Sequence, residues 1–69
     1  MLIKLYTMDD CIYCTMLKAR LNHEKVQYEE IKDAAVIAEK GFTTLPQLEI
    51  YGDVFDFNQA ISFLNRGLA

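Results

Sequence analysis

Both cysteines of the chain lie in one short stretch, Thr7 to Cys14, with the spacing Cys-x-x-Cys. The stretch follows an apolar run, Leu2 to Tyr6, and precedes apolar residues at helical spacing. We therefore expect the cysteines at a turn from a strand into a helix. The unpaired N–H groups and the dipole of a helix N-terminus favour a thiolate over a thiol. A thiolate with a second sulfur in reach is the chemical basis of dithiol–disulfide exchange.

The two cysteines have different expected roles in this exchange. Cys11 lies nearest the loop and the helix end, so we expect it to be the attacking thiolate. Cys14 lies one helical turn further in and would resolve the mixed disulfide. The negative charges of Asp9 and Asp10 oppose ionisation of the first thiol, whereas the helix-end N–H groups and Lys18 favour it. We expect the helix end to have the larger effect.

Other uses of the Cys-x-x-Cys pair are weaker hypotheses. A structural disulfide over so short a loop adds little stability, and a reducing compartment would open it. A zinc site needs about four ligands, and beside the two cysteines the chain offers only His23 and carboxylates, without a second cluster. We therefore predict no metal and place His23 at a solvated helix end rather than in catalysis. An iron–sulfur cluster shared between two chains through Cys11 is the main alternative to exchange.

Length and composition predict a single domain over residues 1–69. Apolar residues make up 52% of the chain, which is enough for a core without metals or structural disulfides. The seven Lys and Arg residues are scattered singly, so we expect no nucleic-acid partner. We expect no membrane span and no signal peptide, because no apolar run is long enough and Met1 leads directly into a strand. Two cysteines do not make the disulfide framework of a secreted protein, and in a reducing cytosol a nearly adjacent pair favours catalysis or metal binding.

The elements that would position the cysteines alternate between strands and helices. We expect four strands, at residues 2–6, 26–31, 47–51 and 54–55. We expect three helices, from about residue 11 or 12 to 23, over 34–40, and from the capping-box sequence at 56–59 to Gly67. Asp10 and Asp33 are the expected N-caps of the first two helices, and Gly41 follows the second.

The expected connections define a mixed sheet. Two strands joined through a helix must run parallel, with a right-handed crossover. The third and fourth strands, joined by a tight turn at Gly52-Asp53, must be antiparallel. The fold class is therefore α/β, with a four-stranded mixed sheet, helices packed on its faces and the order β-α-β-α-β-β-α.

These residues resemble the glutaredoxin family, which has the smallest version of the thioredoxin fold. The segment from Cys11 to Cys14 stands where the family has Cys-Pro-Tyr-Cys, and Lys18 stands at a frequent family lysine. The segment from Gly41 to Pro46 stands where the family has Gly-x-x-Thr-Val-Pro. The similarity extends from Ile3 to Leu64, and the chain resembles the small redoxins of the bacterial or phage type. It implies a minimal thioredoxin fold and a thiol–disulfide oxidoreductase.

The resemblance also implies a substrate groove beside the cysteines. A cis Leu45–Pro46 bond would turn the backbone of Leu45 toward the thiols, ready to pair with a disulfide substrate. Spacing alone leaves Pro46 able simply to begin a strand. Thr44 would contact the ligand or cap its loop, and Tyr13 would form a wall of the groove or serve packing. Phe57 is a core residue by default, although it could also reach the groove.

Several departures from the family concern the source of electrons. Asp56-Phe57 and Gln59-Ala60 stand where the family has a Gly-Gly and an acidic pair that receive the γ-glutamyl end of glutathione. Phe57 in the groove would obstruct that group. Ile12 replaces the usual Pro, and Asp9 and Asp10 stand where a basic residue is frequent.

The partners that the resemblance implies are therefore a disulfide-containing protein client and an electron source. Glutaredoxin-like donors to ribonucleotide reductase, some of them from phages, include members reduced by thioredoxin reductase. We expect ribonucleotide reductase as the foremost client, no bound cofactor, and either glutathione or thioredoxin reductase as the reductant. We expect a monomer in the cytoplasm of a bacterium, or of the host if the chain is encoded by a phage.

Overall fold

The computed structural model describes residues 2–67, and their elements follow the predicted order. The elements are β1 (Ile3–Tyr6), α1 (Ile12–His23), β2 (Glu29–Ile31), α2 (Ala34–Glu39), β3 (Gln47–Ile50), β4 (Asp53–Phe55) and α3 (Phe57–Arg66). The predicted α/β fold class with a four-stranded mixed sheet is confirmed.

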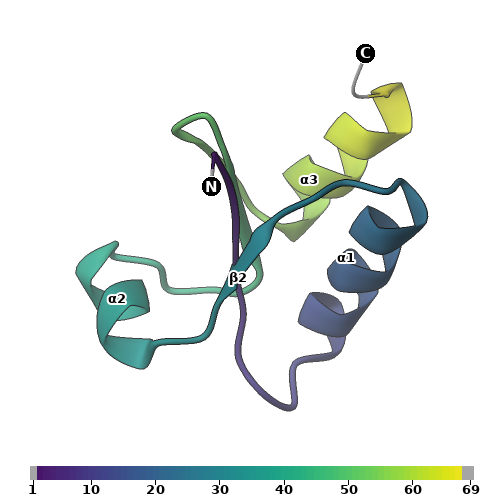
Figure 1. Ribbon diagram of the computed structural model, residues 1–69. Coiled ribbons are helices and arrows are strands. Elements are labelled where there is room, and N and C mark those ends of the chain that lie inside the picture. The colour runs from purple at the N-terminus through teal and green to yellow at the C-terminus, as the bar shows by residue number, and fades with distance from the viewer. Residues whose placement is uncertain (1, 68–69) are drawn as a thin grey trace.

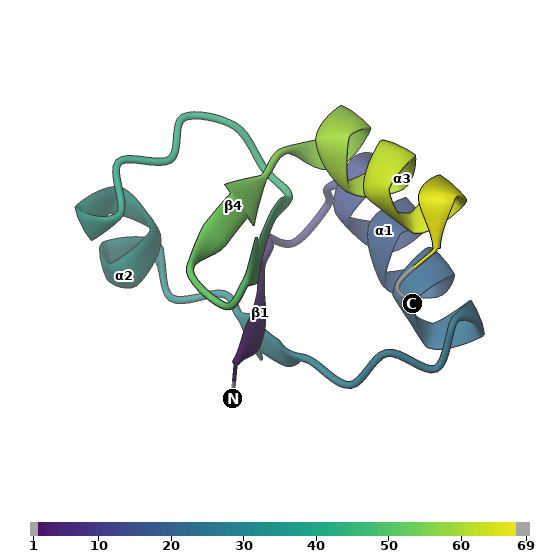
Figure 2. The same cartoon turned by 90° about the horizontal axis from the view of Figure 1, so that it is seen from above.

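The sheet has the strand order β2-β1-β3-β4. β1 runs parallel to β2, with α1 as the crossover, and antiparallel to β3, which pairs antiparallel with β4. Helices α1 and α3 lie side by side on one side of the sheet, whereas α2 lies apart from them on the other side (Figures 1 and 2). The N-terminal end of α1 therefore lies next to the end of the central strand β1, and this position holds the cysteines.

The core lies between the sheet and the α1–α3 pair. Leu5 and Leu48 are opposite each other on β1 and β3 and have no exposed surface. Each buried leucine contributes about 1.5–3 kcal/mol relative to an exposed one. The buried cluster consists of Leu5, Leu17, Leu21, Leu48, Ala60 and Leu64. Phe57, expected as a core residue by default, is half-buried and packs against this cluster together with Phe55.

All three helices begin within a residue of the predicted starts, and two of the three predicted N-caps are confirmed. Asp33 accepts hydrogen bonds from the first N–H groups of α2, and Asp56 begins α3 with a full capping box. Asp10 does not cap α1, because its φ of 57° lies in the left-handed region and not in the extended conformation typical of an N-cap. Cys11 is the N-cap instead, with extended backbone at φ −111° and ψ 109°.

The strand predicted over residues 26–31 is shorter than expected. Val26 still donates its N–H to the Leu21 carbonyl at the end of α1, at 3.0 Å. Pairing with β1 begins only where Glu29 lies opposite Lys4. Residues 26–28 therefore lie in the connection between α1 and β2 rather than in the sheet.

Candidate active site

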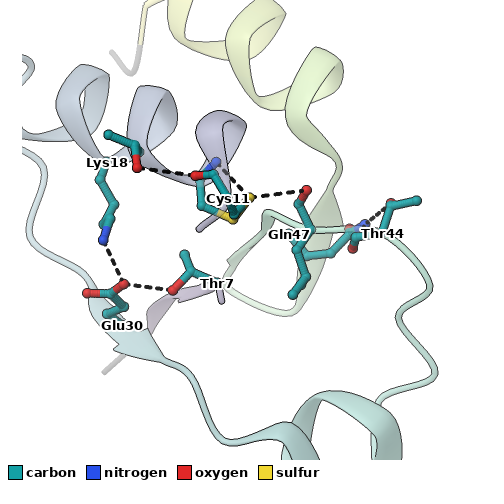
Figure 3. The surroundings of a disulfide bond; sticks show 9 residues. Thr7, Cys11, Lys18, Glu30, Thr44 and Gln47 are labelled. Carbon is teal, nitrogen blue, oxygen red and sulfur yellow. Dashed lines mark hydrogen bonds and ion pairs between the residues drawn. A yellow bond between two sulfur atoms is a disulfide. The ribbon is translucent and has the colours of Figure 1, made fainter. Parts of the chain in front are cut away.

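Cys11 and Cys14 form a disulfide at the N-terminal end of α1 (Figure 3), with their Cα atoms 5.2 Å apart. The two sulfur-bearing residues differ in accessibility, because Cys11 is half-buried and Cys14 is 1% exposed. The inner cysteine packs one helical turn before Leu17, on the buried face of the helix. A reagent from solvent therefore reaches the outer cysteine first.

The sulfur of Cys11 occupies the place of a helix-capping oxygen. The backbone N–H of Cys14 donates to Cys11 Sγ over 3.1 Å, and Thr15 donates from its backbone and hydroxyl to the Cys11 carbonyl at 3.1 and 3.2 Å. A helix N-terminus stabilises negative charge, so this N–H is positioned to favour the thiolate once the disulfide opens. Cys11 Sγ also lies 3.9 Å from the Leu45 carbonyl oxygen. A hydrogen bond between these two atoms requires the thiol form.

A buried hydroxyl and an ion pair lie beside the disulfide (Figure 3). The hydroxyl of Thr7 donates to Glu30 Oε2 at 2.7 Å, and Lys18 Nζ lies 3.1 Å from the same oxygen. The hydrogen bond from Thr7, followed by the one from Lys18, holds the pKa of Glu30 below its ordinary value. Lys18, expected to favour ionisation of Cys11, is thus paired with a carboxylate.

The acidic residues before Cys11 have different surroundings. Asp9 Oδ1 lies 3.1 Å from Lys32 Nζ, and this contact raises the pKa of Lys32. Asp10 is exposed, and no side chain between residues 2 and 67 pairs with its carboxylate. One of the two negative charges is therefore balanced locally, and the other is not.

A cleft of about 410 Å³ opens next to the cysteines. It brings together the four residues that the sequence predicted for the substrate groove, Tyr13, Thr44, Leu45 and Pro46. The remaining lining residues come from the start of α3 and are Asp56, Phe57 and Asn58. The half-buried Phe57 does reach the groove, where its ring centroid lies 4.8 Å from that of Tyr13.

The segment that carries Pro46 is fixed by hydrogen bonds to Thr44 and by a ring contact of Phe42. The Leu45–Pro46 peptide bond is cis. Gln47 Nε2 donates to the carbonyl and hydroxyl oxygens of Thr44, at 3.1 and 3.2 Å. Thr44 therefore both stabilises its own loop and faces the cleft. Phe42, earlier in the same loop, packs edge-on against Tyr6, with the ring centroids 5.0 Å apart.

A hydrogen-bond network links β1, β3 and the end of α2 on the side of the sheet where Tyr6 packs against Phe42. The Tyr6 hydroxyl and Lys40 Nζ both donate to Glu49 Oε1, each at 3.1 Å. Burial, followed by the hydrogen bond to Glu49, raises the pKa of Tyr6. Burial acts to raise the pKa of Glu49 as well, but the hydrogen bonds from Lys40 and Tyr6 hold it below its ordinary value. The tyrosine thus stays protonated and the glutamate ionised, and the network joins Lys40 at the end of α2 to β1 and β3.

The sequence placed one further residue, His23, correctly and missed another, Asn58. His23 is exposed at the far end of α1, away from the disulfide, as expected for a solvated helix terminus. Asn58 lines the cleft but was not expected there. The only available signal was its position two residues after the capping aspartate, which does not distinguish a cleft residue from helix surface.

Residues 2–67 contain neither a membrane-spanning helix nor a metal-binding cluster. None of the helices there is long and apolar enough to cross a membrane. No three His, Cys, Asp or Glu side chains of that part come together to hold a metal ion.

The arrangement of the sheet, the helices and the disulfide defines a thioredoxin-like protein. The solved thioredoxin-like protein BC3987 is 32% identical to this chain and covers 93% of it and 96% of its own length, with a TM-score of 0.75. A single-residue mutant of BC3987 is 31% identical with a TM-score of 0.76, covering 97% of this chain and 99% of its own. Glutaredoxin 1 from Francisella tularensis, complexed with cacodylate, is 20% identical to this chain. It covers 93% of this chain and 92% of its own length, and its TM-score of 0.75 shows a shared fold.

The family model for Glutaredoxin matches residues 3–55. The chain belongs to the glutaredoxin family. No curated protein matches the chain. Family, fold and the Cys11–Cys14 disulfide together support thiol–disulfide oxidoreductase as its general class.

Proposed function

We propose that this protein reduces disulfides of client proteins, cycling its own Cys11–Cys14 pair between dithiol and disulfide. The observation that carries the proposal is the disulfide at the start of α1, with its outer residue half-buried and its inner one 1% exposed. This difference gives the two sulfurs an order of reaction, because only the outer one is open to a client.

The reaction takes place in two exchange steps. The Cys11 thiolate attacks one sulfur of the client disulfide, a Cys11–client S–S bond forms, and the other client sulfur leaves as a thiolate. Cys14, after losing its proton, attacks Cys11 Sγ, which forms the Cys11–Cys14 disulfide and releases the second client thiolate. Two electrons pass from the protein dithiol to the client. The backbone N–H of Cys14, 3.1 Å from Cys11 Sγ, favours the attacking thiolate in the first step.

The start of α3 supports a flavoprotein reductase, such as thioredoxin reductase, as the electron source in place of glutathione. Asp56 Oδ1 accepts the Gln59 N–H at 2.8 Å, and Gln59 Oε1 accepts the Asp56 N–H at 2.9 Å. The carboxylate of the chain itself thus occupies the helix N-terminus, which would otherwise attract the carboxylate of a ligand. Phe57 occupies part of the same cleft. The α-carboxylate of a γ-glutamyl group would meet a like charge, and the group as a whole would meet an aromatic ring.

The first experiment measures NADPH consumption with the disulfide form of the protein in two coupled systems. One system contains glutathione and glutathione reductase, and the other contains a thioredoxin reductase from a compatible host. We expect fast turnover with the flavoprotein alone. Turnover only with glutathione would contradict the proposed electron source. The reduction of insulin disulfides after chemical reduction of the protein tests client activity separately, with Cys11→Ser as the inactive control.

The remaining partners are part of the same proposal. Ribonucleotide reductase is the client that the family resemblance implies, and the protein would act as a monomer without a bound cofactor. In a reducing cytoplasm, cellular reductants would return the Cys11–Cys14 disulfide to the dithiol form after each reaction. The sharing of an iron–sulfur cluster through Cys11 stays a prediction, and no contact in the described residues favours it over exchange.

A further inference from the structure

We propose that the cleft beside the disulfide selects clients with a basic residue, arginine above all, next to the reactive half-cystine. The inference names the substrate class of the proposed reductase and therefore rests on that function. It is carried by the chemistry of the cleft lining and by the balance of charge around Cys11.

The cleft lining combines aromatic rings with a carboxylate. The rings of Tyr13 and Phe57 lie 4.8 Å apart at an interplanar angle of 48°, and Asp56 lies at the same opening. No Lys, Arg or His of residues 2–67 lines this cleft. Aromatic faces and a carboxylate both attract a cation, and a guanidinium group also stacks on rings. The cleft therefore has the composition of a site for a basic side chain.

The uncompensated charge around the cysteines is negative and therefore complements a basic client residue. Two lysines near the cysteines each form an ion pair at 3.1 Å, Lys18 with Glu30 and Lys32 with Asp9. Asp10, adjacent to Cys11, has no such partner within residues 2–67. Asp56 gives only Oδ1 to its helix, which leaves Oδ2 for a ligand. A client approaching Cys11 thus meets uncompensated negative charge, which attracts a cation and repels an acidic segment.

The position of the cleft specifies which client residue it would bind. Tyr13 lies between the two cysteines in sequence, and Leu45 lines the cleft while its carbonyl oxygen is 3.9 Å from Cys11 Sγ. A client backbone paired with Leu45 would hold its half-cystine at Cys11 and direct a neighbouring side chain toward the aromatic pair. The volume of about 410 Å³ falls in the range of small-ligand sites.

The test uses three disulfide peptides that differ only in the residue after the reactive half-cystine, which is Arg, Gln or Glu. The dithiol form of the protein reduces each peptide, and each rate is divided by the rate with dithiothreitol to remove differences in intrinsic reactivity. We expect the Arg peptide to react about three- to tenfold faster than the Gln peptide, and the Glu peptide to react slowest. The differences should shrink in about 1 M salt, where surface charges are screened.

Two charge-removing variants make the test specific to the cleft. Asp56→Asn retains an oxygen for the helix cap but removes the charge, so we expect it to reduce the Arg-to-Glu rate ratio. Asp53→Asn removes an equal charge from an exposed position on β4, outside the cleft, and should leave the ratio unchanged.

Equal normalised rates for the three peptides would overturn the inference while leaving the reductase function intact. The same change of ratio in both variants would also overturn it, because the selection would then follow net charge rather than the cleft. If the protein reduced none of the peptides, the proposed function would fail and the inference with it.

Discussion

Replacing Cys11 by alanine and by serine separates the capping role of this residue from its redox chemistry. Both variants lose the disulfide and the nucleophile, so these losses cancel when the two are compared with each other. They differ in the acceptor for the Cys14 N–H, which now lies 3.1 Å from Cys11 Sγ. Serine retains an acceptor at the N-cap of α1, and alanine does not.

The size of the difference follows from the capping geometry. Loss of an N-cap side chain costs about 1 kcal/mol, within a range of about 0.5–2. In a chain of 69 residues, 1 kcal/mol corresponds to a shift of about 4–8 °C in Tm. We therefore expect Cys11→Ser to be more stable than Cys11→Ala by about 1 kcal/mol, with equal exchange activity of zero.

Urea unfolding followed by circular dichroism measures this difference, with equal m-values as the condition for comparison. Cys14 provides the matched control, because it is 1% exposed on the apolar side of α1. A hydroxyl buried there costs about 1–3 kcal/mol if it finds no partner. The order should therefore be reversed, with Cys14→Ala more stable than Cys14→Ser. Equal stability of the two Cys11 variants would refute the capping argument.

Two further predictions concern the support of the site. The hydrogen bond from Thr7 and the ion pair with Lys18 lower the pKa of Glu30. Their stabilisation of the fold is therefore complete at pH values above the ordinary pKa of 4.5, and it is lost as pH falls through the lowered pKa. Wild type should therefore exceed Glu30→Gln in stability near pH 7, by less than about 1 kcal/mol because the pair is partly exposed. This advantage should be lost progressively as pH falls below 4.5. A pH-independent difference would contradict the assignment. Leu48→Ala, at a position with no exposed surface, should cost about 2–5 kcal/mol in urea unfolding, and a loss below about 1 kcal/mol would contradict its central place in the core.

Local patterns made most of the fold predictable. The spacing of Cys14, Leu17 and Leu21 indicated the buried face of α1, and the acidic residues before α2 and α3 indicated their starts. The start of α1 was predicted correctly but its cap was not, because a sulfur acts as the cap, whereas the preferred capping side chains carry oxygen. The positive φ of Asp10 removes the aspartate that looked like the better cap.

The surroundings of the cysteines depended on contacts that sequence patterns do not record. Thr7 and Glu30 are 23 positions apart and meet only because β1 and β2 pair in parallel with a particular register. Asn58 faces the cleft because α3 packs beside α1, which sets the direction of the first turn of α3. Without the family resemblance, the groove residues around Pro46 would not have been assigned from spacing either.

The negative charge near the cysteines would link client binding to reactivity. Asp10 opposes ionisation of Cys11 while the cleft is empty, whereas the Cys14 N–H favours it. A basic client residue beside the reactive half-cystine would bring a positive charge close to Cys11 and so offset part of this opposition at the moment of attack. The same cation would stabilise the client thiolate as it leaves, and a better leaving thiolate speeds exchange. Selection of a basic client would therefore act on the rate of the chemical step as well as on binding.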